Sequence, residues 1–443
     1  MSDLEREARW NNYLGAIRVC QPINVGGRIV KVAGIVAEAS GPGLSVGSLC
    51  RIEDSEGHHI KAEVVGFKEK RIIVLPFGEM RGVKPGSRIV AMNRRATVGV
   101  GDRYVGRVLD GLGRPIDGKG KIEIEAEYPI YGAVINPLKR EIIHEVMDVG
   151  VCAINSLVTV GKGQRIAIMA GSGVGKSVLM GMIARNTTAD VNIIALIGER
   201  GREVREFVEG TLGEEGLRKS VVVVATSDAP ALVRIRGAYF ATAIAEYFRD
   251  KGLDVILIMD SITRFTMSLR EVGLAAGEPP SSKGYTPSVF TEIPKLLERA
   301  GTVERGGSIT GIYNVLVEGD DMNEPIADSV RSTVDGHIVL SRSLAQKGHY
   351  PAIDVLASVS RVMKDVVDPE HLDSARKFIK ILSTYRAAED LINIGAYVDG
   401  SEPEIDIAKR MIHGMNLFLQ QDIYHRVTFE ESVAKLRELV IDY

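Results

Sequence analysis

The sequence lacks any apolar run of about 18 residues, the length that a membrane-spanning helix needs. Its opening stretch, MSDLEREARWNN, is charged and polar, so it is not a secretory signal. Cysteine is scarce as well. Cys20, Cys50 and Cys152 are scattered, without metal-ligand spacing or the even count of a disulfide framework. These absences favour a reducing cytoplasm, and any membrane role would be that of a peripheral protein.

The chain also lacks an excess of positive charge and is poor in aromatic residues. Its formal net charge is −3, and aromatic residues make up 5% of it. Proteins that bind nucleic acid usually carry a basic surface, so we expect no nucleic-acid partner. Hydrophobic residues at 45% and charged residues at 26% are typical of a globular protein, and 443 residues predict two or three domains.

One stretch carries a chemical pattern, QRIAIMAGSGVGKS at residues 164–177. An apolar run ends in a glycine-rich turn, and a helix-compatible stretch, 178–184, follows. Glycines let backbone N–H groups wrap a polyphosphate, and the helix N-terminus adds positive potential. Lys176 would reach the β- and γ-phosphates, and the Ser177 hydroxyl would bind Mg²⁺. Ala170 replaces the usual first glycine, but it falls where the strand ends. The stretch predicts a P-loop; a glycine-rich turn that carries Lys-Ser by chance is the alternative. The predicted phosphate-binding residues are Gly171, Ser172, Gly173, Val174, Gly175, Lys176, Ser177 and Val178.

Two carboxylates follow apolar runs that predict buried strands. Asp260 ends the run VILIM and could hold Mg²⁺ through water, although such a residue is otherwise a cap or a turn. Glu199 lies in GERGRE after VNIIALI, where it could orient the attacking water or belong to a solvated charged turn. The P-loop favours the catalytic interpretation of both. Spacing alone cannot choose a catalytic arginine among 55 Lys and Arg residues.

The patterning predicts three domains, at 1–95, 96–367 and 368–443. Short strands broken by glycine and proline turns over 27–92 predict a small β-barrel. Alternating apolar strands and helices over 164–362 predict an α/β P-loop domain with a parallel sheet, preceded by a connecting region. We expect Asp228 to cap the helix at 230–248. Apolar residues at helical spacing after Asp368 predict a helical C-terminal domain. Residues 1–20 are a short amphipathic helix or a frayed terminus.

Several motifs together resemble one family. AGSGVGKS, GER at 198–200, DSITRF at 260–265 and SVSRVM at 358–363, with GRVLDGLGRPIDG upstream, resemble rotary-type ATPases that include the catalytic subunits of F- and V-type ATPases. The segments at 277–301 and 317–342 are similar to the ATPases of type III protein export, and the segment at 34–53 is most similar to the flagellar branch.

The resemblance implies a fold, an assembly and residue roles. It implies an N-terminal β-barrel, a central RecA/F1-like ATPase domain and a C-terminal helical domain, assembled as a homohexamer that uses ATP and Mg²⁺. Glu199 would be the general base and Asp260 the Walker B acid. Arg361 would be an arginine finger for the neighbouring subunit, and Tyr350 would stack on adenine. Arg264 and Arg200 would hold phosphate or the catalytic carboxylate.

The resemblance also implies a cellular role. The protein would be a motor of flagellar export at the inner face of the cytoplasmic membrane, releasing substrates from chaperones and delivering them to the membrane export gate. A stalk protein and a negative regulator would be its partners. A virulence secretion ATPase is the near alternative.

Other classes fit the sequence less well. A proton-driven synthase subunit is disfavoured because 401–406 is only loosely acidic, and a non-catalytic ring subunit because Glu199 is present. An RNA-translocating hexamer is disfavoured because 27–92 holds only Phe67 and Phe77 as aromatics.

Overall fold

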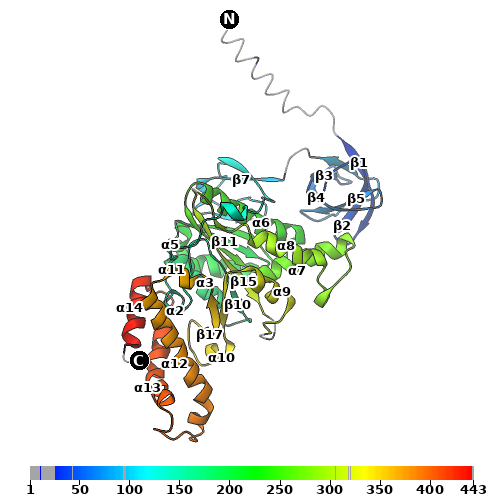
Figure 1. Cartoon of the computed structure of the whole chain (residues 1–443). Coiled ribbons are helices and arrows are strands. Elements are labelled where there is room, and N and C mark those ends of the chain that lie inside the picture. The colour runs from blue at the N-terminus through cyan, green and yellow to red at the C-terminus, as the bar shows by residue number, and fades with distance from the viewer. Residues whose placement is uncertain are drawn as a thin grey trace, which may run out of the picture. The chain divides into compact units, whose positions relative to one another are not determined.

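The computed structural model describes Trp10 and residues 25–41, 43–92, 96–304, 306–317, 319 and 321–441. Two compact units make up the chain, Met1–Ala96 and Thr97–Tyr443 (Figure 1). Apart from Trp10, the predicted helix of residues 1–20 lies outside the described residues. Within the described residues, no helix combines the length and the apolar character needed to span a bilayer.

The first unit contains a closed barrel of six strands in the order β1-β2-β5-β4-β3-β6. Apolar side chains alternate with polar ones along these strands, and the inward set, from Ile29 to Ile89, forms a separate core. This confirms the predicted β-barrel. The strands are β1 Gly26–Ala33, β2 Val36–Ser40, β3 Leu49–Glu53, β4 His59–Lys68, β5 Arg71–Pro76 and β6 Arg88–Ala91.

A nine-stranded sheet forms the centre of the second unit, in the order β17-β16-β10-β15-β13-β11-β12-β8, with β14 beside β15. All pairs are parallel except those that β17 and β14 make. Every residue of β11 and of β12 is buried, as predicted for strands covered on both faces. The strands are β8 Val108–Asp110, β10 Arg165–Ala170, β11 Val191–Ile197, β12 Ser220–Ala225, β13 Asp254–Asp260, β14 Gly301–Thr302, β15 Ser308–Leu316, β16 Gly336–Leu340 and β17 Ile353–Ser360. A separate ribbon pairs β7 Thr97–Val100 with β9 Ala126–Pro129.

Helices follow most of these strands. One predicted cap is wrong: α6 begins after Pro230 and has no side-chain cap, because Asp228 lies inside the preceding turn, where Ala229 N donates to Thr226 O at 3.0 Å. The helices are α2 Cys152–Leu157, α3 Lys176–Asn186, α4 Gly201–Arg205, α5 Gly213–Arg218, α6 Ala231–Asp250, α7 Ile262–Ala276, α8 Pro287–Leu297, α9 Pro325–Thr333, α10 Arg342–Gln346 and α11 Met363–Val366. A π-helical segment, η3 Glu206–Leu212, continues α4, and 3-10 turns lie at η1 Asp102–Tyr104, η2 Pro137–Lys139 and η4 Ser282–Gly284.

Three helices end the chain, namely α12 Pro369–Asn393, α13 Pro403–Leu419 and α14 Phe429–Leu439. Asp368 caps α12 by accepting the His371 amide at 2.8 Å, as the Asp-Pro start predicted. These helices pack beside α2 (Figure 1). Phe378 and Leu436 belong to the same apolar core as Ile166 of the central sheet, so the helical region and the ATPase region form one compact unit.

Candidate active site

The P-loop joins β10 to α3 at the carboxyl edge of the central sheet. Ala170 is the last residue of β10 and pairs with Leu316 on one side and Leu340 on the other. Gly173 and Gly175 have φ of 79° and 91°, a left-handed backbone that favours glycine. Lys176 then begins α3. The local sequence therefore produces a tight glycine turn that leads directly into the N-terminus of α3, the end of a helix that favours an anion.

Lys176 meets both predicted carboxylates. Its Nζ lies 2.5 Å from Asp260 Oδ1 and 3.9 Å from Glu199 Oε1. Asp260 ends β13 and Glu199 follows β11; these strands are neighbours, with Leu196 paired to Asp260. The three charged side chains are largely buried, at 11%, 4% and 17% exposed for Lys176, Asp260 and Glu199. The sheet order thus gathers residues that are far apart in the sequence.

The surroundings of Glu199 favour the protonated, neutral form of its carboxyl group. Burial, and next the charge of Asp260, raise the pKa of Glu199 to about 7, although Lys176 acts in the opposite direction. The Glu199 carbonyl accepts the Ser227 amide at 3.0 Å, which fixes the backbone at the strand end. A carboxylate with a pKa near the working pH is suited to accept a proton from water.

Arg264 reaches the same edge from the first turn of α7. Gly198, with φ of 75°, lets this helix approach, because a Cβ there would lie 2.7 Å from the Arg264 Cβ. Arg264 Nε is buried and has no hydrogen-bond partner among the described residues, so a donor remains for an anion. Arg200 is exposed and pairs with Glu203 at 3.1 Å, so the structure does not bring it to Lys176.

A cavity of 390 Å³ opens beside the P-loop. Tyr350 lies at its wall, and a Cβ on Gly175 would sit 3.6 Å from the Tyr350 ring. Tyr350 is 45% exposed, so part of its side chain is accessible for stacking on a planar group. The cavity is lined by Gly173, Gly175, Val178, Leu179, Met182, Leu340, Tyr350, Pro351, Ala352, Gln421 and Ile423. A P-loop continuous with an apolar, aromatic-walled pocket has the features of a nucleotide site.

Comparison with known families agrees with this geometry. Residues 150–360 match the ATP synthase alpha/beta family, nucleotide-binding domain; 29–93 match the beta-barrel domain of that family; and 367–438 match the T3SS EscN ATPase C-terminal domain. The chain belongs to the type III secretion ATPases of the ATP synthase alpha/beta family.

Relatives of this export ATPase match it along nearly its whole length. It is 55% identical to the flagellum-specific ATP synthase of Bacillus subtilis over 93% of this chain and 94% of that one. The assembled ATPase EscN of the enteropathogenic E. coli type III secretion system is 45% identical, with a TM-score of 0.89, and covers 94% of this chain and 100% of its own. EscN in complex with its central stalk EscO is 43% identical, with a TM-score of 0.86 and the same coverage. The expected three-part fold is thereby confirmed.

Arg361 of the export ATPase lies away from the P-loop of its own chain. It follows β17, which runs antiparallel to β16 and pairs Ser360 with Gly336 at the start of that strand. The Arg361 amide donates to Asp335 O at 3.0 Å, and the side chain is exposed. The P-loop follows the opposite end of the parallel strand β10. Within one chain the structure therefore does not unite Arg361 with Lys176.

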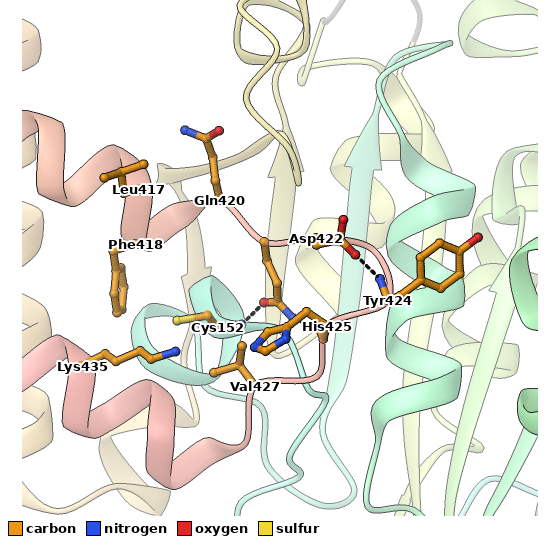
Figure 2. Close-up of a pocket in the computed structure, with 10 residues that line it drawn as sticks. Cys152, Leu417, Phe418, Gln420, Asp422, Tyr424, His425, Val427 and Lys435 are labelled. Carbon is orange, nitrogen blue, oxygen red and sulfur yellow. Dashed lines mark hydrogen bonds between the residues drawn. The ribbon is translucent and has the colours of Figure 1, made fainter.

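No sequence motif marks Gln421 and Ile423, which line the nucleotide cavity from the loop between α13 and α14. The Gln421 amide donates to the Tyr350 carbonyl at 3.0 Å. Its side chain accepts the Cys152 amide at 2.8 Å and donates to Gly150 O at 2.8 Å. The same glutamine borders a second, open pocket of 580 Å³ between this loop, α2 and α14 (Figure 2). Hydrogen bonds from Gln421 thus connect this loop to Tyr350 and to the start of α2.

Proposed function

We propose that this export ATPase hydrolyses ATP with Mg²⁺ as the ring-forming motor of flagellar protein export. The observation that carries the proposal is the convergence of Lys176, Glu199 and Asp260 at a P-loop that opens into an aromatic-walled cavity. Flagellum-specific relatives reach 55% identity, against 47% for the type 3 secretion system ATPase of Xanthomonas euvesicatoria, which favours the flagellar branch over virulence secretion.

Each residue has a chemical task in this proposal. The cradle N–H groups and the Lys176 ammonium bind the phosphates, while the Ser177 hydroxyl and Asp260 hold Mg²⁺. Asp260 and Ser177 are suited to Mg²⁺, because a buried carboxylate and a hydroxyl beside the P-loop supply the oxygen ligands that this ion prefers. The bound ion would neutralise charge on the phosphate oxygens. Glu199 takes a proton from the attacking water; the new O–P bond forms as the bond from the γ-phosphorus to ADP breaks. Arg264 supplies a further donor from α7.

A neighbouring protomer completes the site. Arg361 is exposed at the far end of the sheet, so it serves the nucleotide of an adjacent copy in a homohexamer. Partly buried apolar side chains lie around Gly161, close to this segment: a Cβ on Gly161 would meet Ile143 and Val362, and Ile142, the neighbour of Ile143, is 84% exposed. An apolar side chain as exposed as that of Ile142 would be covered in an interface between copies.

The cellular setting belongs to the same proposal. The ring works in the cytoplasm, peripherally at the inner face of the cytoplasmic membrane. It binds a central stalk, as the relative EscN does, together with a negative regulator, and it releases export substrates from chaperones at the membrane export gate. The similarity to export ATPases along nearly the whole chain supports these partners.

A chromosomal Glu199→Gln substitution tests the function. We expect export of flagellar hook and rod proteins to stop, while Glu206→Gln, an exposed carboxylate on the same segment, leaves it intact. Loss of needle-protein export instead would assign the protein to virulence secretion. Normal export of both classes by the Glu199 variant would refute hydrolysis as the motor step.

A further inference from the structure

We propose that Gln164 is a positioning residue for the arginine finger: its buried amide holds the backbone segment that carries Arg361. The inference rests on the proposed function, which assigns Arg361 to the nucleotide of the neighbouring protomer. Gln164 lies immediately before β10, the strand that ends in the P-loop.

The Gln164 side chain is fully buried, at 0% exposed, and both of its polar atoms are used. Nε2 donates to Ser360 Oγ at 3.0 Å and lies 3.4 Å from the Asp335 carbonyl. Oε1 accepts the Gly161 amide at 2.9 Å. A buried amide satisfied on both sides is held in a single orientation, because losing a partner costs the desolvation of that group.

These partners surround Arg361. Ser360 precedes it in the chain, and the Asp335 carbonyl that Nε2 approaches also accepts the Arg361 amide at 3.0 Å. The Ser360 hydroxyl donates in turn to Thr159 O at 2.7 Å. The backbone on which the exposed Arg361 side chain stands is therefore held from the interior by a set of hydrogen bonds that includes the buried Gln164 amide. Such support sets where the guanidinium projects, and catalysis by an arginine finger depends on that position.

The same strand links the finger to the nucleotide site of its own chain. Gln164 adjoins one end of β10 and the P-loop follows the other, six residues away, or about 20 Å. Gln164 and the P-loop are thus separated by the length of this strand, so replacing Gln164 should leave phosphate binding in place.

Two variants and a matched control test the inference. Gln164→Leu removes both hydrogen-bonding atoms of the side chain. Ser360→Ala removes only the hydroxyl that Gln164 Nε2 contacts, so this variant still tests the inference if Gln164→Leu fails to fold. Thr310→Val is the control, because the Thr310 hydroxyl accepts the Gly163 amide at 2.9 Å, on the same turn but away from Ser360. The measurements are kcat on assembled rings and the Kd for Mg-ADP on dilute protein.

We expect Gln164→Leu to lower kcat by about tenfold or more, since a misplacement of about 1 Å in a catalytic group can cost about 10²-fold. The Kd should stay within about twofold, because the P-loop lies at the other end of β10. Ser360→Ala should show the same pattern to a smaller degree, and Thr310→Val should change neither quantity by more than about twofold.

Three results would overturn the inference: unchanged kcat in Gln164→Leu or Ser360→Ala, a Kd that weakens in step with kcat, or an equal loss of kcat in Thr310→Val. Arg361→Ala separates this failure from failure of the proposed function. If Arg361→Ala stops turnover while Gln164→Leu does not, only the positioning role is wrong. If Arg361→Ala turns over normally, the finger assignment itself is wrong.

Discussion

Arg361 and Lys176 lie at opposite ends of the same β-sheet. Lys176 follows the carboxyl end of β10. Arg361 follows β17, and its amide donates to the carbonyl of Asp335, the residue before the amino end of β16. Strands of five or six residues separate these two edges by about 15–20 Å. No arginine side chain crosses that distance, so an Arg361 that contacts nucleotide must contact that of another protomer.

The first prediction concerns Arg361→Ala. The substitution should leave the Kd for Mg-ATP within about threefold and lower kcat in assembled rings by about 10³-fold or more, the usual contribution of an arginine finger. Steady-state phosphate release and calorimetry measure the two quantities. Lys364→Ala, an exposed cation three residues further along, is the control and should keep both values. Normal turnover by Arg361→Ala would remove it from the site.

The second prediction concerns Glu199→Gln. The amide keeps the size of the side chain but cannot take a proton, so Mg-ATP should still bind while kcat falls by about 10²–10⁴-fold. Single-turnover hydrolysis of radiolabelled ATP measures the residual rate. Retained steady-state hydrolysis would show that another group is the base.

The third prediction concerns pH. Because the pKa of Glu199 is raised to about 7, the carboxyl is mostly protonated at pH 6 and cannot accept a proton there. The value of kcat/KM, which reports the free enzyme, should therefore rise with pH through about 7 and level off above it. Glu203 raises the pKa of Glu199. Glu203→Gln should therefore lower that pKa and move the rise of kcat/KM to lower pH. A flat profile between about pH 5.5 and pH 8 would contradict the role of Glu199.

The fourth prediction concerns the aromatic wall of the cavity. Tyr350→Ala should weaken Mg-ATP binding by about 1–3 kcal/mol, the usual contribution of stacking between a base and an aromatic ring. Tyr350→Phe retains the ring and should bind within about twofold of the original protein. Titration with a fluorescent ATP analogue measures both. Equal weakening by the two variants would mean that the hydroxyl, not the ring, makes the contact.

The fold was predictable where a local pattern determines it. The apolar β-branched runs of β11 and β12 and the Asp368-Pro369 start of α12 correspond to the observed elements. The cap of α6 was not predictable, because a turn placed Asp228 out of reach of the helix. The motif match anticipated the three-part architecture, but the single core shared by Ile166, Phe378 and Leu436 is a property of tertiary packing that no periodicity reveals.

The site was predictable where strand ends meet. Lys176, Glu199 and Asp260 converge because parallel strands place their carboxyl ends at one edge. Arg361 and Tyr350 came only from motif resemblance, and the structure brings Tyr350 to the P-loop. Gln421 contacts Tyr350 across about 70 residues of sequence, through a loop without a motif, so only the folded chain reveals it.

The most direct test of the account is the rate of ATP hydrolysis per protomer across a dilution series, with mass measured in parallel and Glu199→Gln as the blank. If each site is completed by Arg361 of the next copy, the rate per protomer should be negligible for monomers and should rise and then saturate as rings form. A rate per protomer that stays constant down to concentrations where only monomers remain would show that one chain holds a complete site, and would contradict the account.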